Sequence, residues 1–161
     1  MSAMKKVALG IAAALITSTA VMSTAVASEA RSEKHAKQAT ELRQSVFKLL
    51  ASNIGPMGAM ARGKMPMDKA VVEKNATRIN QLSMMITDYM ATDTRKFKVN
   101  TEALASNWTK PELLAEKANA LTMASANLMK VVKSGDEKAI KKAIGGIGRT
   151  CGGCHDDFKQ D

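Results

Sequence analysis

Apolar residues recur every three or four positions along most of the chain, which is the spacing of helices with one buried side. No long alternating run of β-branched residues indicates a strand. The pattern predicts a helix over 33–61, a second over 68–90 and a third from about 109–111 to 134. A fourth helix follows the Ser134-Gly135-Asp136 turn and includes Phe158.

The first predicted helix has two neighbouring stripes that together form a broad face, which we expect to be buried. One stripe contains Leu42, Val46, Leu49 and Asn53, and the other contains Arg43, Phe47, Leu50, Ile54 and Met57. Gly55-Pro56 interrupts the pattern. Because proline lacks a backbone N–H and clashes with the preceding turn, we expect a kink or an early end there.

The other three predicted helices each carry one apolar stripe. The stripes are Val72, Asn75, Ile79, Leu82, Ile86 and Tyr89; Leu114, Ala118, Leu121, Ser125, Leu128 and Val132; and Ile140, Ile144, Ile147, Cys151, Cys154 and Phe158. Four amphipathic helices with mostly short links predict an all-α fold, an antiparallel up-down-up-down four-helix bundle.

The longest irregular stretch is 91–108, and a loop of this length in a compact domain needs a function or is disordered. We expect Phe97 and Trp108 to tie it to the body. Trp108 could also cover the edge of a cofactor, although an ordinary core or loop-anchoring tryptophan is the simpler interpretation.

The N-terminus has the features of an export signal. Lys5 and Lys6 precede an apolar run, and Ala25-Val26-Ala27 is a small-x-small cleavage sequence. We expect cleavage after Ala27, which leaves one domain over 28–161. The apolar run is short for a membrane span and contains polar residues, so we expect export to the periplasm without stable membrane association.

The formal charge of the 161-residue chain is +9, and loss of Lys5 and Lys6 with the signal leaves +7. Basic residues are interspersed with acidic ones, and there are only five aromatic residues. A nucleic-acid-binding protein of the base-stacking kind is therefore not expected.

Candidate chemistry lies at the C-terminus, where Cys151, Cys154 and His155 form a C-x-x-C-H run. In this pattern two thiols attach one haem covalently and the adjacent histidine ligates the iron. We therefore expect one haem c per chain. The competing uses of the two cysteines, a disulfide, a thiol redox pair or a metal site, are disfavoured by the adjacent histidine and by the lack of a βαβ pattern.

Both cysteines fall on the apolar stripe of the last helix, so we expect the haem to be embedded in the core. Lys159 follows His155 by four residues, and its ammonium could lie on the proximal side of the haem or at the surface. Gly145, Gly146 and Gly148 suggest close approach by the porphyrin or a neighbouring helix, or a local break.

The second axial position of the iron is not decided by pattern alone. The chain has twelve methionines, but methionine on a helix is more often core filling than a ligand. His35 near the start of the first helix is interpreted as a surface residue.

The whole chain after residue 27 resembles the cytochrome c prime family. The resemblance rests on Arg43-Gln44-Ser45-x-Phe47, on Thr101-Glu102-Ala103-Leu104 followed by Trp108, on the C-x-x-C-H run near the C-terminus, and on Lys159. It implies that Arg43 and Gln44 lie beside the haem propionates and that Thr101 and Glu102 lie near the haem edge.

The resemblance also implies that Phe47 faces the open side of the iron, where low-spin relatives have a methionine ligand and cytochromes c prime often have leucine. Phe47 has no lone pair to donate, so a five-coordinate, mainly high-spin iron is expected. Lys159 stands where many members have arginine, and it lacks the planar fork of arginine.

An apolar distal face has no hydrogen-bond donor for bound dioxygen, whereas NO and CO depend less on one. We therefore expect a protein that binds NO and CO and buffers or scavenges NO, with electron transfer to an unidentified redox partner as a second role. A homodimer through the first two helices is implied by the resemblance. The alternatives are a six-coordinate electron carrier with a methionine ligand and, with less support, an enzyme that turns over NO or peroxide.

Overall fold

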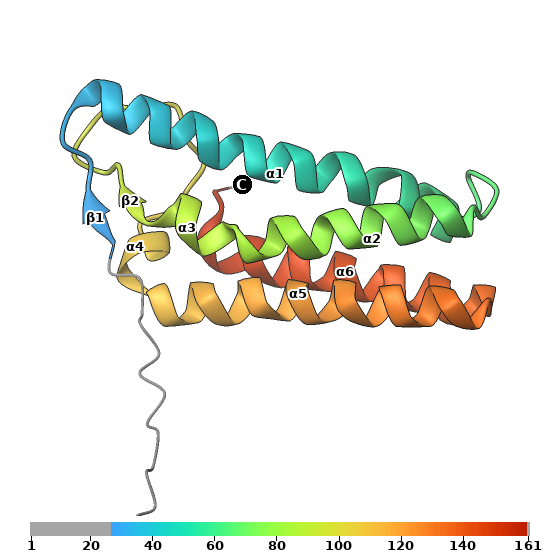
Figure 1. The fold of residues 1–161 in the computed structure, drawn as a ribbon. Helices are drawn as coiled ribbons and strands as arrows, with labels where there is room; N and C mark the ends of the chain where they lie inside the picture. Colours follow the sequence, from blue (N-terminus) through green and yellow to red (C-terminus); the bar gives the residue numbers. More distant parts are fainter. Residues whose placement is uncertain (1–26, 161) are drawn as a thin grey trace, which may run out of the picture.

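Four long antiparallel helices form the body of the protein, and the computed structural model describes residues 27–160. They are α1 (Glu33–Ala61), α2 (Lys69–Met84), α5 (Pro111–Ser134) and α6 (Glu137–Phe158). Successive long helices run in opposite directions, and α6 returns beside α1 (Figure 1). The four-helix bundle predicted from the sequence is confirmed. The predicted signal peptide, 1–27, lies outside the described residues except for Ala27.

The helix starts are set by local side-chain caps. Ser32 accepts a hydrogen bond from the His35 backbone N–H at 3.2 Å, and Asp68 accepts one from Val71 at 3.0 Å. Asp136 accepts from the N–H groups at the start of α6. Such caps satisfy N–H groups that have no partner within the helix. At the C-terminal end of α5, Gly135 adopts the left-handed conformation (φ 76°) that ends the helix.

α1 passes through Pro56 without ending. The expected early end is therefore wrong. The residue before a proline is normally pushed out of the helical region by a clash that involves its Cβ. Gly55 has no Cβ, so this part of the clash is absent and the helix continues to Ala61.

The second predicted helix is divided at Met85 into α2 and the short α3 (Ile86–Met90). The Ser83 hydroxyl donates to the Asn80 carbonyl at 2.7 Å and also pairs with the Thr122 hydroxyl of α5. Side-chain bonds to a helix carbonyl compete with the backbone ladder and bend helices. The polar contact between Ser83 and α5 therefore lies close to the break between α2 and α3.

One end of the bundle carries the remaining elements, β1 (Ser28–Glu29), β2 (Thr92–Asp93) and α4 (Ser106–Thr109) (Figure 1). β1 and β2 are parallel, with Ser28 opposite Thr92. A pair of two-residue strands is too short to show an alternating pattern, so it was not predicted. The last turns of α6 lie at this same end.

The core follows the predicted stripes of α2, α5 and α6 closely, but the stripes of α1 only in part. The buried side of α1 consists of Ala36, Thr40, Arg43, Val46, Leu50, Asn53, Met57 and Met60. Leu42 and Leu49 are about half exposed, at 54% and 52%. The broad buried face predicted for α1 is thus narrower, because the 3.6-residue turn carries Leu42 and Leu49 away from the bundle axis. No helix within residues 27–160 has the length and apolar character that a membrane crossing requires.

Replacing Leu128 in α5 with alanine tests the core. Leu128 is fully buried in the main cluster, so Leu128→Ala should lower the free energy of unfolding by about 2–5 kcal/mol. Met123→Ala, at a position 64% exposed on the same helix, is the matched control and should change it by less than about 0.5 kcal/mol. Chemical denaturation measures both. Equal effects would contradict the packing described here.

Candidate haem site

The C-x-x-C-H run occupies the last two turns of α6. Cys151 and Cys154 are half-buried and pack against the apolar core, whereas His155 is exposed. On a helix, residues three and four apart share a face, so both sulfurs and the imidazole project from one side of α6. Both cysteines are free thiols, and burial raises the pKa of each. The geometry is that of two thiols and one imidazole presented together to one ligand.

Lys117 of α5 reaches across to this turn. Its Nζ donates to the Gly153 carbonyl oxygen, between the two cysteines, at 2.8 Å, and lies 2.8 Å from Asp157 Oδ2. The hydrogen bond that Lys117 donates to Asp157 raises the pKa of Lys117, and the ammonium partly opposes the effect of burial on the pKa of the Cys154 thiol. Sequence reasoning missed Lys117, because a lysine that is not itself on the apolar stripe of its helix is interpreted as a solvent-facing charge.

Arg43 of α1 is a buried cation without a carboxylate partner. Its side chain is 2% exposed. Nη2 donates to the hydroxyl oxygens of Thr40 and Thr101 at 3.3 and 3.2 Å, while Nη1 has no hydrogen-bond partner. Burial lowers the pKa of Arg43. Because buried polar groups are normally paired, this guanidinium fits an anionic group that residues 27–160 do not supply.

Trp108 of α4 supports this guanidinium. Its indole N–H donates to the carbonyl oxygens of Met90 and Thr92 at 2.9 and 3.0 Å. Arg43 Cζ lies 5.2 Å from the ring centroid, and Arg95 Cζ lies 5.8 Å from it. Cations over an indole face are attracted by its π electrons. Trp108 thus anchors the 91–108 loop, as the simpler sequence interpretation expected, and also contacts the Arg43 guanidinium.

The loop before α4 contacts both α1 and the residues that follow α6. Gln44 Nε2 donates to the Asn100 carbonyl at 2.9 Å, next to the Thr101 hydroxyl that binds Arg43. Glu102 accepts from the Gln160 backbone N–H through its carbonyl at 2.7 Å and pairs with Lys159 through its carboxylate at 3.0 Å. The structure therefore brings Arg43, Gln44, Thr101 and Glu102 to the same end as the C-terminal motif, and their places beside the haem stay a prediction.

Lys159 follows the end of α6 rather than lying on it. α6 ends at Phe158, and the Lys159 backbone is extended and forms an isolated bridge with Ala103. Its ammonium turns to Glu102. The helical projection used to place it beside His155 is therefore wrong, because the helix stops one residue earlier. Its relation to the proximal side of the haem stays a prediction.

Phe47 lies on α1 one turn after Arg43 and is 37% exposed. α1 and α6 are neighbouring helices of the bundle, so Phe47 and the cysteines lie on helices that contact each other. Its side chain has no atom that can ligate iron.

No neighbouring helix packs closely against the glycines before the motif. A Cβ on Gly145 or Gly146 would meet only the Arg149 guanidinium at 3.7–3.8 Å, and one on Gly148 would meet nothing within 4 Å. α6 is also continuous through all three. Close approach of another helix and a local break are therefore both wrong.

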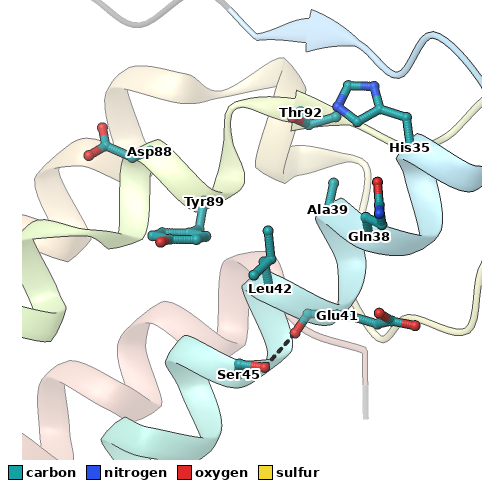
Figure 2. Close-up of a pocket in the computed structure, with 9 residues that line it drawn as sticks. All are labelled: His35, Gln38, Ala39, Glu41, Leu42, Ser45, Asp88, Tyr89 and Thr92. Carbon is teal, nitrogen blue, oxygen red and sulfur yellow. Dashed lines mark hydrogen bonds between the residues drawn. The ribbon is translucent and has the colours of Figure 1, made fainter.

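Two hollows lie elsewhere, between α1 and the α2–α3 segment. One, of about 720 Å³, is lined by residues that include His35, Leu42, Asp88 and Tyr89, and Figure 2 shows Leu42 and Tyr89 turned toward it. The other, of about 540 Å³, includes Leu49 and Met85. Neither contains the C-x-x-C-H residues or Arg43, so neither is the candidate site.

The arrangement fits a haem. Its thiols and imidazole suit covalent attachment and iron ligation, and the unpaired Arg43 Nη1 suits a carboxylate. The Cytochrome C′ family model matches residues 38–159. The chain belongs to the cytochrome c′ family. Haem c, bound covalently, is accordingly its cofactor.

Individual relatives agree. Cytochrome c′ of Rubrivivax gelatinosus is 36% identical over 122 residues, which cover 76% of this chain and 94% of that protein. Cytochrome c prime from Shewanella frigidimarina has a structure similar to this one, with a TM-score of 0.71 and 37% identity over 78% of this chain and 97% of that one. A nitric oxide complex of a variant of cytochrome c prime from Alcaligenes xylosoxidans matches with a TM-score of 0.69 and 25% identity over 78% and 96% of the two chains.

Trp108→Phe tests the support of the site. It removes the indole N–H and leaves the Met90 and Thr92 carbonyls without that donor, so it should lower the free energy of unfolding by about 1–3 kcal/mol. Tyr89→Phe removes a polar atom from a half-buried ring and should change the free energy of unfolding by less than about 0.5 kcal/mol. Thermal and urea unfolding of the haem-loaded protein provide the measurement. A silent Trp108→Phe would show that these hydrogen bonds do not hold the loop.

Proposed function

We propose that Cys151 and Cys154 attach the haem through thioether bonds and that His155 ligates its iron from one side. The support is their common face at the end of α6 and the half-buried position of both sulfurs against the core. When bound, the haem supplies a one-electron couple and an iron position for a small ligand.

Around the ring, Arg43 binds a propionate through its free Nη1, and Gln44 and Thr101 hold the surrounding loop in place. This assignment is supported by the burial of Arg43 without any acidic side chain bonded to it. A charge-assisted hydrogen bond to a carboxylate offsets the cost of burying the guanidinium. Glu102 lies at the haem edge and is held there by Lys159 and Gln160.

Phe47 faces the second axial position and leaves it without a protein ligand. The next methionine along α1, Met57, is ten residues away, which is about 15 Å along the helix, and it is fully buried in the core. The iron is therefore five-coordinate, and the six-coordinate electron carrier is disfavoured.

An apolar distal side favours NO and CO over dioxygen, because Phe47 donates no hydrogen bond to a partly negative ligand. The nitric oxide complex of the Alcaligenes xylosoxidans relative supports this assignment. The proposed function is a periplasmic cytochrome that binds NO and CO, buffers NO and exchanges electrons with a redox partner. It is a binding and electron-transfer protein rather than an enzyme. The predicted signal peptide supports the location.

The face of α1 and α2 that carries the two hollows is the surface for a homodimer. Leu42 and Leu49 are exposed there, Met85 of the α2–α3 junction lies beside Leu49, and both hollows open between these elements. Burying such apolar area against a second copy would remove it from water.

The observation that carries the proposed function is the phenylalanine at position 47, and a visible spectrum tests it. The reduced wild-type protein should show a high-spin Soret band that shifts on CO addition. Phe47→Leu should keep both properties. Phe47→Met adds a thioether that competes for the iron, so it should give low-spin bands and weaken CO binding by about tenfold or more, about 1.4 kcal/mol. A wild-type spectrum that is low-spin and indifferent to CO would reject the proposal.

Leu49→Glu tests the dimer. A carboxylate on this apolar surface must be desolvated on association, so the variant should sediment as a monomer at concentrations where the wild type is a dimer. Met123→Glu, on an exposed position of α5 outside the surface, should sediment like the wild type. A wild type that is monomeric throughout the concentration range would contradict the assignment.

A further inference from the structure

Lys117 and Asp157 form a charged pair at the turn of α6 that carries the cysteines. Neither residue is among those that the family resemblance indicated. Lys117 is the only described residue of α5 whose charged group bonds to α6. Its ammonium contacts the Gly153 carbonyl and the Asp157 carboxylate, so it lies between one cysteine and the turn after the histidine. The side chains of Lys117 and Asp157 are only 27% and 36% exposed, which limits screening by solvent.

The position of this pair follows from the chain itself. Gly153 is bonded directly to Cys154, and Asp157 lies two residues after His155. Any haem attached at Cys154 therefore lies in the field of this ammonium and of its carboxylate partner.

We propose that Lys117 and Asp157 set the reduction potential of the haem with opposite signs, the ammonium favouring the reduced state and the carboxylate the oxidised state. This inference rests on the proposed attachment at Cys151 and Cys154, but not on gas binding. Reduction adds one electron to the ferric haem and forms or breaks no bond in the protein. Because the haem loses one positive charge, a nearby cation disfavours the ferric state and a nearby anion stabilises it.

The two groups are also positioning residues, because Lys117 ties α6 to α5 at the motif. A structural role and an electrostatic role predict different results when charge is removed one group at a time. If the shifts in reduction potential come from damaged packing, they should add when both groups are replaced. If they come from opposite electric fields, they should cancel.

The experiment is a redox titration of the haem-loaded protein for four variants. Lys117→Met should lower the equilibrium constant for reduction about tenfold, which is about 59 mV for one electron. Asp157→Asn, which keeps an oxygen that can accept the Lys117 hydrogen bond, should raise it by a similar factor. The double variant should return to within about threefold of the wild type, and Lys117→Arg, which keeps the charge, should do the same.

Lys130→Met is the matched control, because Lys130 is exposed on the same helix about 20 Å along its axis from Lys117. It should change the constant by less than about twofold. Shifts of Lys117→Met and Asp157→Asn in the same direction, or a double variant displaced further than either single one, would overturn the proposal. Haem staining of denatured protein separates this result from the parent assignment: chains without bound haem would reject attachment, whereas stained chains with unmoved potentials would reject only the charge pair.

Discussion

A guanidinium buried without a carboxylate is the constraint around which this end of the bundle is arranged. Taking Arg43 out of water is costly unless its donors are paired, and the chain satisfies only part of them. Thr40 from the preceding turn and Thr101 from the loop accept from Nη2, and the Trp108 ring lies beside the planar group. The remaining donor needs an anion. In the proposed site a haem carboxylate is that anion, so the cofactor would complete the polar core as well as the chemistry. Arg43 itself contacts both the 91–108 loop and α4.

The fold was largely predictable because helical spacing is a strong signal over twenty or more residues. The ends of α1 and α5 agree with the sequence because Ser32 and Gly135 are local signals. Three features escaped. Pro56 was expected to kink α1 or end it early, but α1 continues to Ala61, because Gly55 removes part of the clash. The break at Met85 depends on a contact between Ser83 and Thr122, which are 39 positions apart. Leu42 and Leu49 look like core residues, because sequence spacing alone does not show which side of a helix meets its neighbours.

The site residues also fall into those that the sequence predicts and those that it does not. Cys151, Cys154 and His155 lie within five consecutive residues and could be recognised directly. Arg43 and Thr101 came from a resemblance, and the structure shows that they contact each other. Lys159 was placed by continuing a helix that ends at Phe158. Lys117 carried no signal at all: its importance comes from a carbonyl 36 positions away, and only packing of α5 on α6 creates that contact. Motif chemistry is thus local and readable, whereas the charges that act on it are contributed by neighbouring helices.

The composition of α6 shows why attachment and packing belong together. The helix contains Gly145, Gly146, Gly148, Gly152 and Gly153. At about 1 kcal/mol each relative to alanine, they cost on the order of 5 kcal/mol, which is comparable to the net stability of a small domain. In the first half of α6 this cost is offset by Ile140, Ile144 and Ile147, which are buried in the core. The second half contributes only one buried apolar side chain, Phe158. A covalently attached haem stays on the unfolded chain as well, so it stabilises the folded state through the apolar surface that it buries there. The last helix is therefore weakest in isolation at the turn that holds the cofactor, and α6 and the haem stabilise one another.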